Sequence, residues 1–130
     1  MPDPMHIVVV DDEPALLESL RAYLTRLGYV VTGFQNAKAA WDYFVSDSSV
    51  CSVIIVDLTL GGMSGEELIR KVLAHKPDMA VVATSGYHPA LYDLRALRAP
   101  RLATLEKPFT PQMLTEALKR LFSNQKAAPG

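Results

Sequence analysis

The chain has 130 residues, of which 49% are hydrophobic and 21% are charged, and this composition is typical of one globular domain with its own core. Its formal net charge is −1, which excludes a strong electrostatic attraction to nucleic acid or to an anionic membrane surface. The single cysteine, Cys51, excludes an internal disulfide and is expected to be buried as a small hydrophobic residue.

The first half of the chain alternates short apolar runs with amphipathic helical patterns. In order, we expect a strand at 7–10, a helix at 13–27, a strand at 29–34, a helix at about 36–46 and a strand at 53–56. Pro14 suits the first turn of the first helix, and Gly28 suits its C-terminal end. Asn36 can cap the second helix. The third strand is apolar throughout, as expected for a strand that is covered on both faces.

The second half repeats this alternation. We expect a helix at 64–75, a strand at 79–83, a helix at roughly 89–97, a strand at 102–105 and a last helix from Thr110-Pro111 to about 122. Ser64 and Glu67 have the spacing of a capping box. The strand at 102–105 is the weakest of the five because it is short. Residues 123–130 are expected to form a frayed tail.

This strict alternation predicts an α/β fold with a doubly wound, five-stranded parallel sheet and helices on both faces. Five strand–helix units fill the chain, and no internal linker, repeat or low-complexity segment separates them. We therefore expect a single domain over 1–130, with a core at about 5–123 and a flexible tail at 124–130.

Polar side chains follow four of the expected strands. Asp11 and Asp12 follow the first strand, Asp57 the third, Ser85 the fourth and Lys107 the fifth. The carboxyl ends of parallel strands share one edge of the sheet, where open α/β sheets bind their ligands. Clustered carboxylates raise one another's pKa or hold a cation, and hard oxygen ligands suit Mg²⁺.

Together these groups fit a phosphoryl group attached to a carboxylate. Asp57 would be the nucleophile, because carboxylates form aspartyl-phosphates. A metal ion and Lys107 would offset the charge on the transferring oxygens, and Ser85 would add a hydroxyl donor.

The chain resembles the receiver domain of two-component response regulators over about residues 5–123. The matching motifs are Asp11-Asp12, Asp57, Ser85-Gly86 and Lys107-Pro108-Phe109, together with the turn from Asp57 to Gly65, in which Met63 and Gly65 are in step and Gly61 replaces the usual proline. The resemblance implies the flavodoxin-like (βα)5 fold with strand order 2-1-3-4-5.

The resemblance also implies a phosphoacceptor site that uses Mg²⁺. Asp57 would accept a phosphoryl group from a sensor histidine kinase or a histidine phosphotransfer protein. Asp12, Asp57 and the backbone carbonyl of Thr59 would bind Mg²⁺, and Asp11 would act through water. Such a domain is a signalling switch rather than an enzyme with a separate substrate.

A second set of residues would read the phosphoryl group. Lys107 would pair with its oxygens, and Ser85 would swing towards them and carry the signal to the surface. The family commonly has a cis peptide at Lys107-Pro108. It usually places Tyr or Phe three residues before the lysine, where this chain has Thr104. Our hypothesis is that the output surface is read differently here, through Tyr87 or Tyr92.

Other functions on a similar sheet are open to comparison. A phosphatase of the haloacid-dehalogenase-like class also forms an aspartyl-phosphate, but it needs an acid two residues after Asp57, where this chain has Thr59. Flavin or nucleotide binding is disfavoured because Asp11-Asp12-Glu13 would repel phosphate. A receiver used only for docking is disfavoured because all the site residues are present.

Less specific interpretations of the single motifs also exist. Asp11 and Asp12 could cap the first helix, Asp57 could form a turn, and Lys107 could be an ordinary surface lysine. His88 would be an ordinary loop histidine. Their occurrence together, each after a strand, favours the functional interpretation.

The remaining predictions concern location and partners. No secretory signal or membrane-spanning stretch is visible, so we expect a cytoplasmic protein without membrane attachment. No basic recognition helix follows Phe122, and direct nucleic-acid binding is not expected. The resemblance fits a stand-alone regulator as well as a receiver cut from a larger protein, and it is compatible with a homodimer that forms on phosphorylation. The downstream target is not identified by the sequence.

Overall fold

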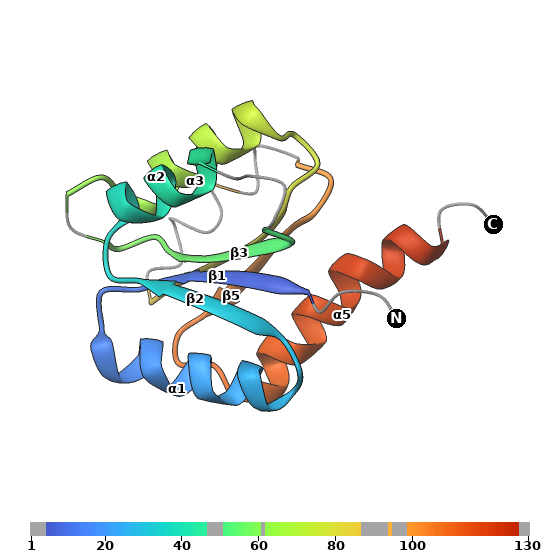
Figure 1. The fold of residues 1–130 in the computed structure, drawn as a ribbon. Helices are drawn as coiled ribbons and strands as arrows, with labels where there is room; N and C mark the ends of the chain where they lie inside the picture. The colour runs from blue at the N-terminus through green and yellow to red at the C-terminus, as the bar shows by residue number, and fades with distance from the viewer. Residues whose placement is uncertain (1–4, 47–50, 61, 87–93, 95–98, 128–130) are drawn as a thin grey trace.

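The computed structural model describes residues 5–46, 51–60, 62–86, 94 and 99–127 (Figure 1). Its strands are β1 (His6–Val10), β2 (Val30–Phe34), β3 (Val53–Asp57), β4 (Ala80–Ser85) and β5 (Leu102–Glu106). The helices described are α1 (Pro14–Arg26), α2 (Ala37–Ser46), α3 (Gly65–His75) and α5 (Pro111–Ala127). The helix expected at 89–97 lies outside the described residues, apart from Leu94.

The five strands form one parallel sheet in the order β2-β1-β3-β4-β5. Helices α2 and α3 cover one face of this sheet, and α1 and α5 cover the other (Figure 1). The predicted doubly wound fold is therefore confirmed, including its strand order.

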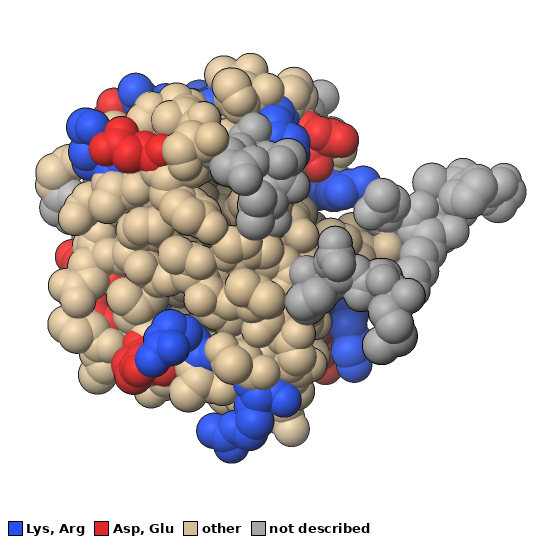
Figure 2. Space-filling model, viewed as in Figure 1, with Lys and Arg blue, Asp and Glu red and all other residues tan. Residues whose placement is uncertain are grey.

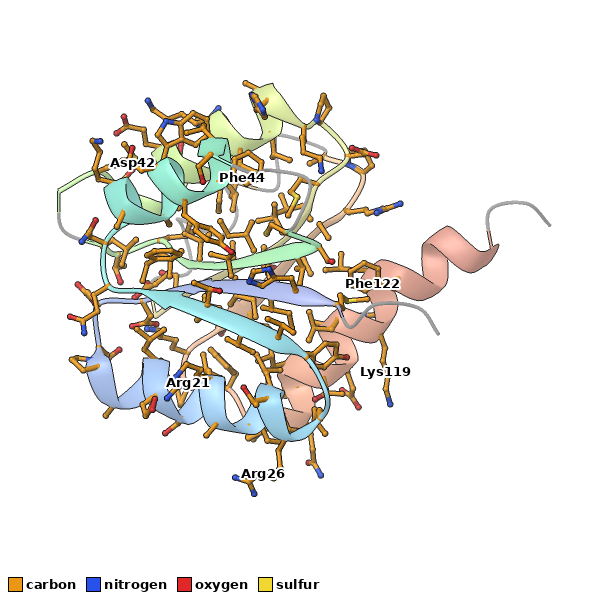
Figure 3. The ribbon with its side chains drawn as sticks, viewed as in Figure 1. Arg21, Arg26, Asp42, Phe44, Lys119 and Phe122 are labelled. Carbon is orange, nitrogen blue, oxygen red and sulfur yellow. The ribbon has the colours of Figure 1, made fainter. Side chains whose placement is uncertain are left out.

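Two apolar cores lie on the two faces of the sheet. Successive strand side chains point to opposite faces, so Val8 and Val10 of β1 pack on the side of α2 and α3, while Ile7 and Val9 pack on the side of α1 and α5. The strands β1, β3 and β4 are buried along their whole length. Figure 3 shows the Phe44 side chain of α2 directed towards the sheet, whereas Arg26 of α1 points away from the protein.

Local sequence signals set several helix ends and one close contact. The side chain of Ser64 accepts a hydrogen bond from Glu67 N at 3.0 Å and caps α3, and Asn36 Oδ1 accepts one from Ala39 N at 2.8 Å at the start of α2. Gly33 in β2 lies against α1, where an added Cβ would come within 3.0 Å of Leu17 Cδ1. Helix α1 therefore packs directly on the β2 backbone.

The largest difference from the predicted boundaries is at the end of the last helix. A frayed tail was expected from residue 123, but the backbone of α5 is helical as far as Ala127, and its last turns project beyond the sheet (Figure 1). Gln125, Lys126 and Ala127 are good helix formers, and no proline or glycine interrupts the chain before Pro129. Intrinsic helix propensity therefore favours continuation of the α5 backbone to Ala127.

Other expectations from the composition can be compared with the described residues. Cys51 is buried, as expected, and burial raises the pKa of its thiol to about 11. None of the helices in the described ranges is both long enough and apolar enough to cross a bilayer. On the face shown in Figure 2, acidic and basic groups lie around the margins, and neither sign forms a continuous patch.

Candidate functional site

The backbone of the sheet brings the predicted polar residues to one edge. Asp11 directly follows β1, and its N–H donates to Phe34 O at 3.0 Å. Asp57 and Ser85 are the last residues of β3 and β4, so they lie inside the sheet ladder rather than in the loops beyond it. Lys107 directly follows β5, and its N–H donates to Ser85 O at 2.8 Å. Strand pairing thus fixes the backbone positions of all four residues.

Lys107 is the centre of the site. Its Nζ donates to Asp11 Oδ2 at 2.9 Å, to Asp57 Oδ2 at 3.0 Å and to Glu13 Oε1 at 3.0 Å. A lysine ammonium has three hydrogen-bond donors. Each of the three can therefore serve one carboxylate, and together they hold three acids from two strand ends in one cluster.

Asp57 is almost completely enclosed. Its side chain is 2% exposed, and Oδ1 accepts hydrogen bonds from Thr59 N at 2.9 Å and from Thr59 Oγ1 at 2.8 Å. Since Oδ2 faces Lys107, both carboxylate oxygens are oriented by neighbours. No fully buried side-chain nitrogen or oxygen in the described part of the chain lacks a hydrogen-bond partner.

Burial and pairing act in opposite directions on the pKa values. Burial raises the pKa of Asp11 above its ordinary value of 3.8, and hydrogen bonds from Glu13 N–H and Lys107 only partly offset that effect. Burial of Lys107 favours a lower pKa, but its hydrogen bonds to Asp11, Asp57 and Glu13 outweigh burial and raise the pKa. Lys107 therefore stays charged at neutral pH and supplies the positive charge that the buried acids need.

Three of the acids fit a hard metal ion. Asp11, Asp12 and Asp57 each offer a carboxylate oxygen, and these oxygens lie within 4.8 Å of one another. Asp12 is exposed, whereas Asp11 and Asp57 are buried, so the group opens to solvent on one side. Carboxylates open to water match the preference of Mg²⁺, which keeps several of its waters.

The N-terminus of α3 packs closely against the backbone of Asp57 and Leu58. A Cβ added to Gly65 would lie 2.1 Å from the backbone oxygen of Asp57 and 2.8 Å from Leu58 Cα. No side chain fits there, so the glycine allows α3 to approach the end of β3 closely. Gly65 matches the glycine of the family's turn motif, and this close contact explains why a glycine is needed at that position.

The predicted switch residues lie on β4 and β5. Ser85 is fully buried and pairs with Glu106 in the parallel ladder, while the half-buried Thr104 pairs with Ala83. The Lys107–Pro108 peptide bond is cis. Tyr87, Tyr92 and His88 lie outside the described residues.

Sequence reasoning missed one contact in this site. The sequence predicts Glu13 as the start of the first helix and as part of an acidic stretch that would repel phosphate, but it does not predict that the Glu13 carboxylate reaches Lys107. Its position directly after Asp11-Asp12 was the available signal, since residues at the start of α1 border the same edge of the sheet.

Comparisons with known proteins point to one family. The sequence model of the response regulator receiver domain matches residues 7–119. A chemotaxis protein CheY homolog from Campylobacter jejuni is 34% identical over 118 residues, which cover 88% of this chain and 90% of that protein.

Solved structures of similar proteins share the fold over nearly the whole chain. A CheY-like receiver domain protein from Methanospirillum hungatei is 27% identical with a TM-score of 0.82, and the match covers 95% of this chain and 98% of that one. The response regulator TrrA from Thermotoga maritima, solved in complex with Mg²⁺ and BeF, is 28% identical with a TM-score of 0.75, and the match covers 90% of this chain and 98% of that one.

Proposed function

This chain belongs to the response regulator receiver domain family, and from that premise we propose that Asp57 accepts a phosphoryl group from a sensor histidine kinase or a histidine phosphotransfer protein. The observation that carries the proposal is the position of Lys107, whose ammonium nitrogen lies 3.0 Å from Asp57 Oδ2. A fixed cation beside a carboxylate favours phosphoryl transfer, because it offsets negative charge on the transferring oxygens.

The transfer exchanges one bond for another. An oxygen of Asp57 forms a bond to phosphorus while the bond between phosphorus and the donor's histidine nitrogen breaks. That nitrogen keeps the bonding electron pair, and because the other ring nitrogen of the donor's phosphohistidine carries a proton in this step, the leaving group is a neutral imidazole. The tight enclosure of Asp57 supports a single, defined direction of attack, because both of its oxygens are held by hydrogen bonds.

We also propose that the site uses Mg²⁺. Asp12, Asp57 and the backbone carbonyl of Thr59 would hold the ion, and Asp11 would act through a water molecule. The support is the group of carboxylate oxygens within 4.8 Å of one another. The bound ion would supply positive charge to the phosphoryl oxygens, and Lys107 would add positive charge from the carboxyl end of β5.

For signal transmission, we propose that Ser85 and Lys107 bind the phosphoryl oxygens. The backbone hydrogen bond from Lys107 N to Ser85 O supports this pairing, because it ties the two residues together at neighbouring strand ends. Thr104 replaces the usual aromatic residue, so the output surface would be read through other residues, with Tyr87 and Tyr92 as the candidates from the sequence.

Members of this family are generally phosphoacceptor switches rather than enzymes with a separate substrate. We propose that residues 1–130 form one such receiver, that it works in the cytoplasm, and that it binds neither nucleic acid nor membrane directly. Formation of a homodimer on phosphorylation is part of this proposal, and its test is light scattering before and after phosphorylation.

The decisive test is the intact mass after incubation with acetyl phosphate and Mg²⁺. We expect one phosphoryl adduct on the wild type and none on Asp57→Asn. Asp42→Asn is the matched control, because Asp42 is an exposed carboxylate on α2 that pairs with Lys38. No adduct from acetyl phosphate or from a phosphorylated kinase would contradict the proposal, as would an adduct that persists in Asp57→Asn.

A further inference from the structure

Glu13 connects the start of α1 to the centre of the site. Its backbone N–H donates to Asp11 Oδ1 at 2.9 Å, and its carbonyl accepts from Leu17 N in the first turn of the helix. It occupies the N-cap position, but its side chain makes no capping hydrogen bond. The side chain instead reaches Lys107, with 3.0 Å between Oε1 and Nζ.

The three carboxylates on Lys107 differ in their exposure to water. The side chains of Asp11 and Asp57 are 4% and 2% exposed, whereas that of Glu13 is 64% exposed. An exposed ion pair is screened by water and contributes little, while a buried carboxylate loses much when its partner leaves. The contact with Glu13 is therefore the one that Lys107 can release at the lowest cost.

Lys107 has no spare donor in this arrangement. All three ammonium hydrogens have carboxylate acceptors, so binding a phosphoryl oxygen requires Lys107 to give up one of them. The phosphoryl group also brings negative charge to a cluster that already contains Glu13. Both effects make the Glu13 contact favour the unphosphorylated arrangement.

We propose that Glu13 is a positioning residue that anchors Lys107 in the unphosphorylated protein and is released when Asp57 carries a phosphoryl group. This inference rests on the proposed function. It assigns the exposed start of α1 a part in setting how readily the site accepts a phosphoryl group.

The test uses beryllium fluoride, which mimics a phosphoryl group when it is bound to a carboxylate, in the presence of Mg²⁺. Removing the charge of Glu13 in Glu13→Gln should tighten beryllium fluoride binding, measured by titration calorimetry, by roughly two- to fivefold, the range of a weak exposed ion pair. Glu18→Gln is the matched control, because Glu18 is another exposed α1 carboxylate, 59% exposed, whose ion pair with Arg21 lies on the same helix. We expect no change for Glu18→Gln.

A double-mutant cycle separates action through Lys107 from a general effect of charge. In a Lys107→Ala background, Glu13→Gln should no longer change the affinity for beryllium fluoride. An equal change in both backgrounds would show that Glu13 acts only through its field, and it would overturn the proposal. Equal affinities of wild type and Glu13→Gln would also overturn it.

A second measurement reads Lys107 directly. The ¹³Cε resonance of Lys107 should move on addition of beryllium fluoride to the wild type, and in free Glu13→Gln it should already lie part of the way towards the bound position. If the ¹³Cε resonance of Lys107 in free Glu13→Gln has the same position as in the free wild type, the proposed role of Glu13 is wrong. If the wild type itself binds no beryllium fluoride in the presence of Mg²⁺, the proposed function fails and the inference fails with it, whereas the other contrary outcomes affect Glu13 alone.

Discussion

Burial of a side chain has opposite effects on stability in the interior of the strands and at their carboxyl ends. Along β3, the residues before Asp57 are apolar and buried, and packing against helices on both faces stabilises them. At its end, Asp57 is equally buried but charged, and it depends on Lys107 from another strand end. Burial is favourable in the interior, whereas at the edge it costs free energy unless each charge has a partner.

This contrast explains why the contacts within the enclosed site depend on one another. An apolar core residue has many interchangeable neighbours, so the loss of one contact changes little in the others. The buried acids share a single lysine, and any change in its contacts alters the whole group. Substitutions in the two regions should therefore have different effects on stability and on phosphorylation.

A substitution in the apolar interior can lower stability without changing any residue of the site. Ile54→Ala, in a fully buried position of β3, should lower the free energy of unfolding by roughly 2–5 kcal/mol through the lost apolar contacts and the resulting cavity. Urea denaturation measures this change. Phosphorylation by acetyl phosphate at a temperature where the variant is folded should remain within the range of the wild type, and a lost adduct would show that interior and edge are not separable.

Gly65→Ala tests the border between the two regions. The added methyl group would meet the Asp57 carbonyl at 2.1 Å, so α3 has to move away, at a cost of roughly 1–3 kcal/mol. Unlike Ile54→Ala, this variant should also lose phosphorylation rate, because the clash falls on the backbone of Asp57 and Leu58 and pushes on the segment that holds the Asp57 carboxylate. Gly62→Ala is unsuitable as a control, because Gly62 has a positive φ of 69° and the substitution would itself strain the backbone. Ala74→Gly is the control, because it also lowers the stability of α3 but lies away from the site. A normal phosphorylation rate in Gly65→Ala would contradict the role of this close approach.

Asp11→Asn tests the cost of a buried charge, and the expected change is the smallest of the three. Burial raises the pKa of Asp11 above its ordinary value of 3.8, so the folded state resists its ionisation. The stability that Asp11 contributes is therefore complete below pH 3.8 and is lost as the pH rises through its folded pKa. We expect Asp11→Asn to be the more stable protein at pH 7 without Mg²⁺, and the difference to shrink towards pH 4.

Urea denaturation at the two pH values, with and without Mg²⁺, checks this expectation. Mg²⁺ should stabilise the wild type more than Asp11→Asn, because the metal relieves the repulsion that the substitution removes. A wild type that gains stability over Asp11→Asn as the pH rises would reverse the sign and contradict the balance of burial and pairing at Asp11.

Periodicity in the chain was enough to predict the fold and to predict that the candidate site residues meet at one edge of the sheet. The alternation of apolar runs with helical patterns specified a doubly wound parallel sheet because periodicity directly encodes which residues must be buried. Because the carboxyl ends of parallel strands meet at one edge, the sequence also predicts that Asp11, Asp57, Ser85 and Lys107 lie on that edge. Helix caps such as Ser64 were equally local and equally predictable.

The tertiary structure alone decided which groups touch and how strongly each is enclosed. That Lys107 serves three carboxylates, that Glu13 is the exposed one among them, and that Gly65 leaves room for the Asp57 backbone all depend on side-chain and backbone distances between segments far apart in the chain. No periodic pattern encodes such distances, because they follow from the packing of whole elements against one another. The end of α5 shows the opposite case, where local propensity continued a helix that the expected core pattern had already left.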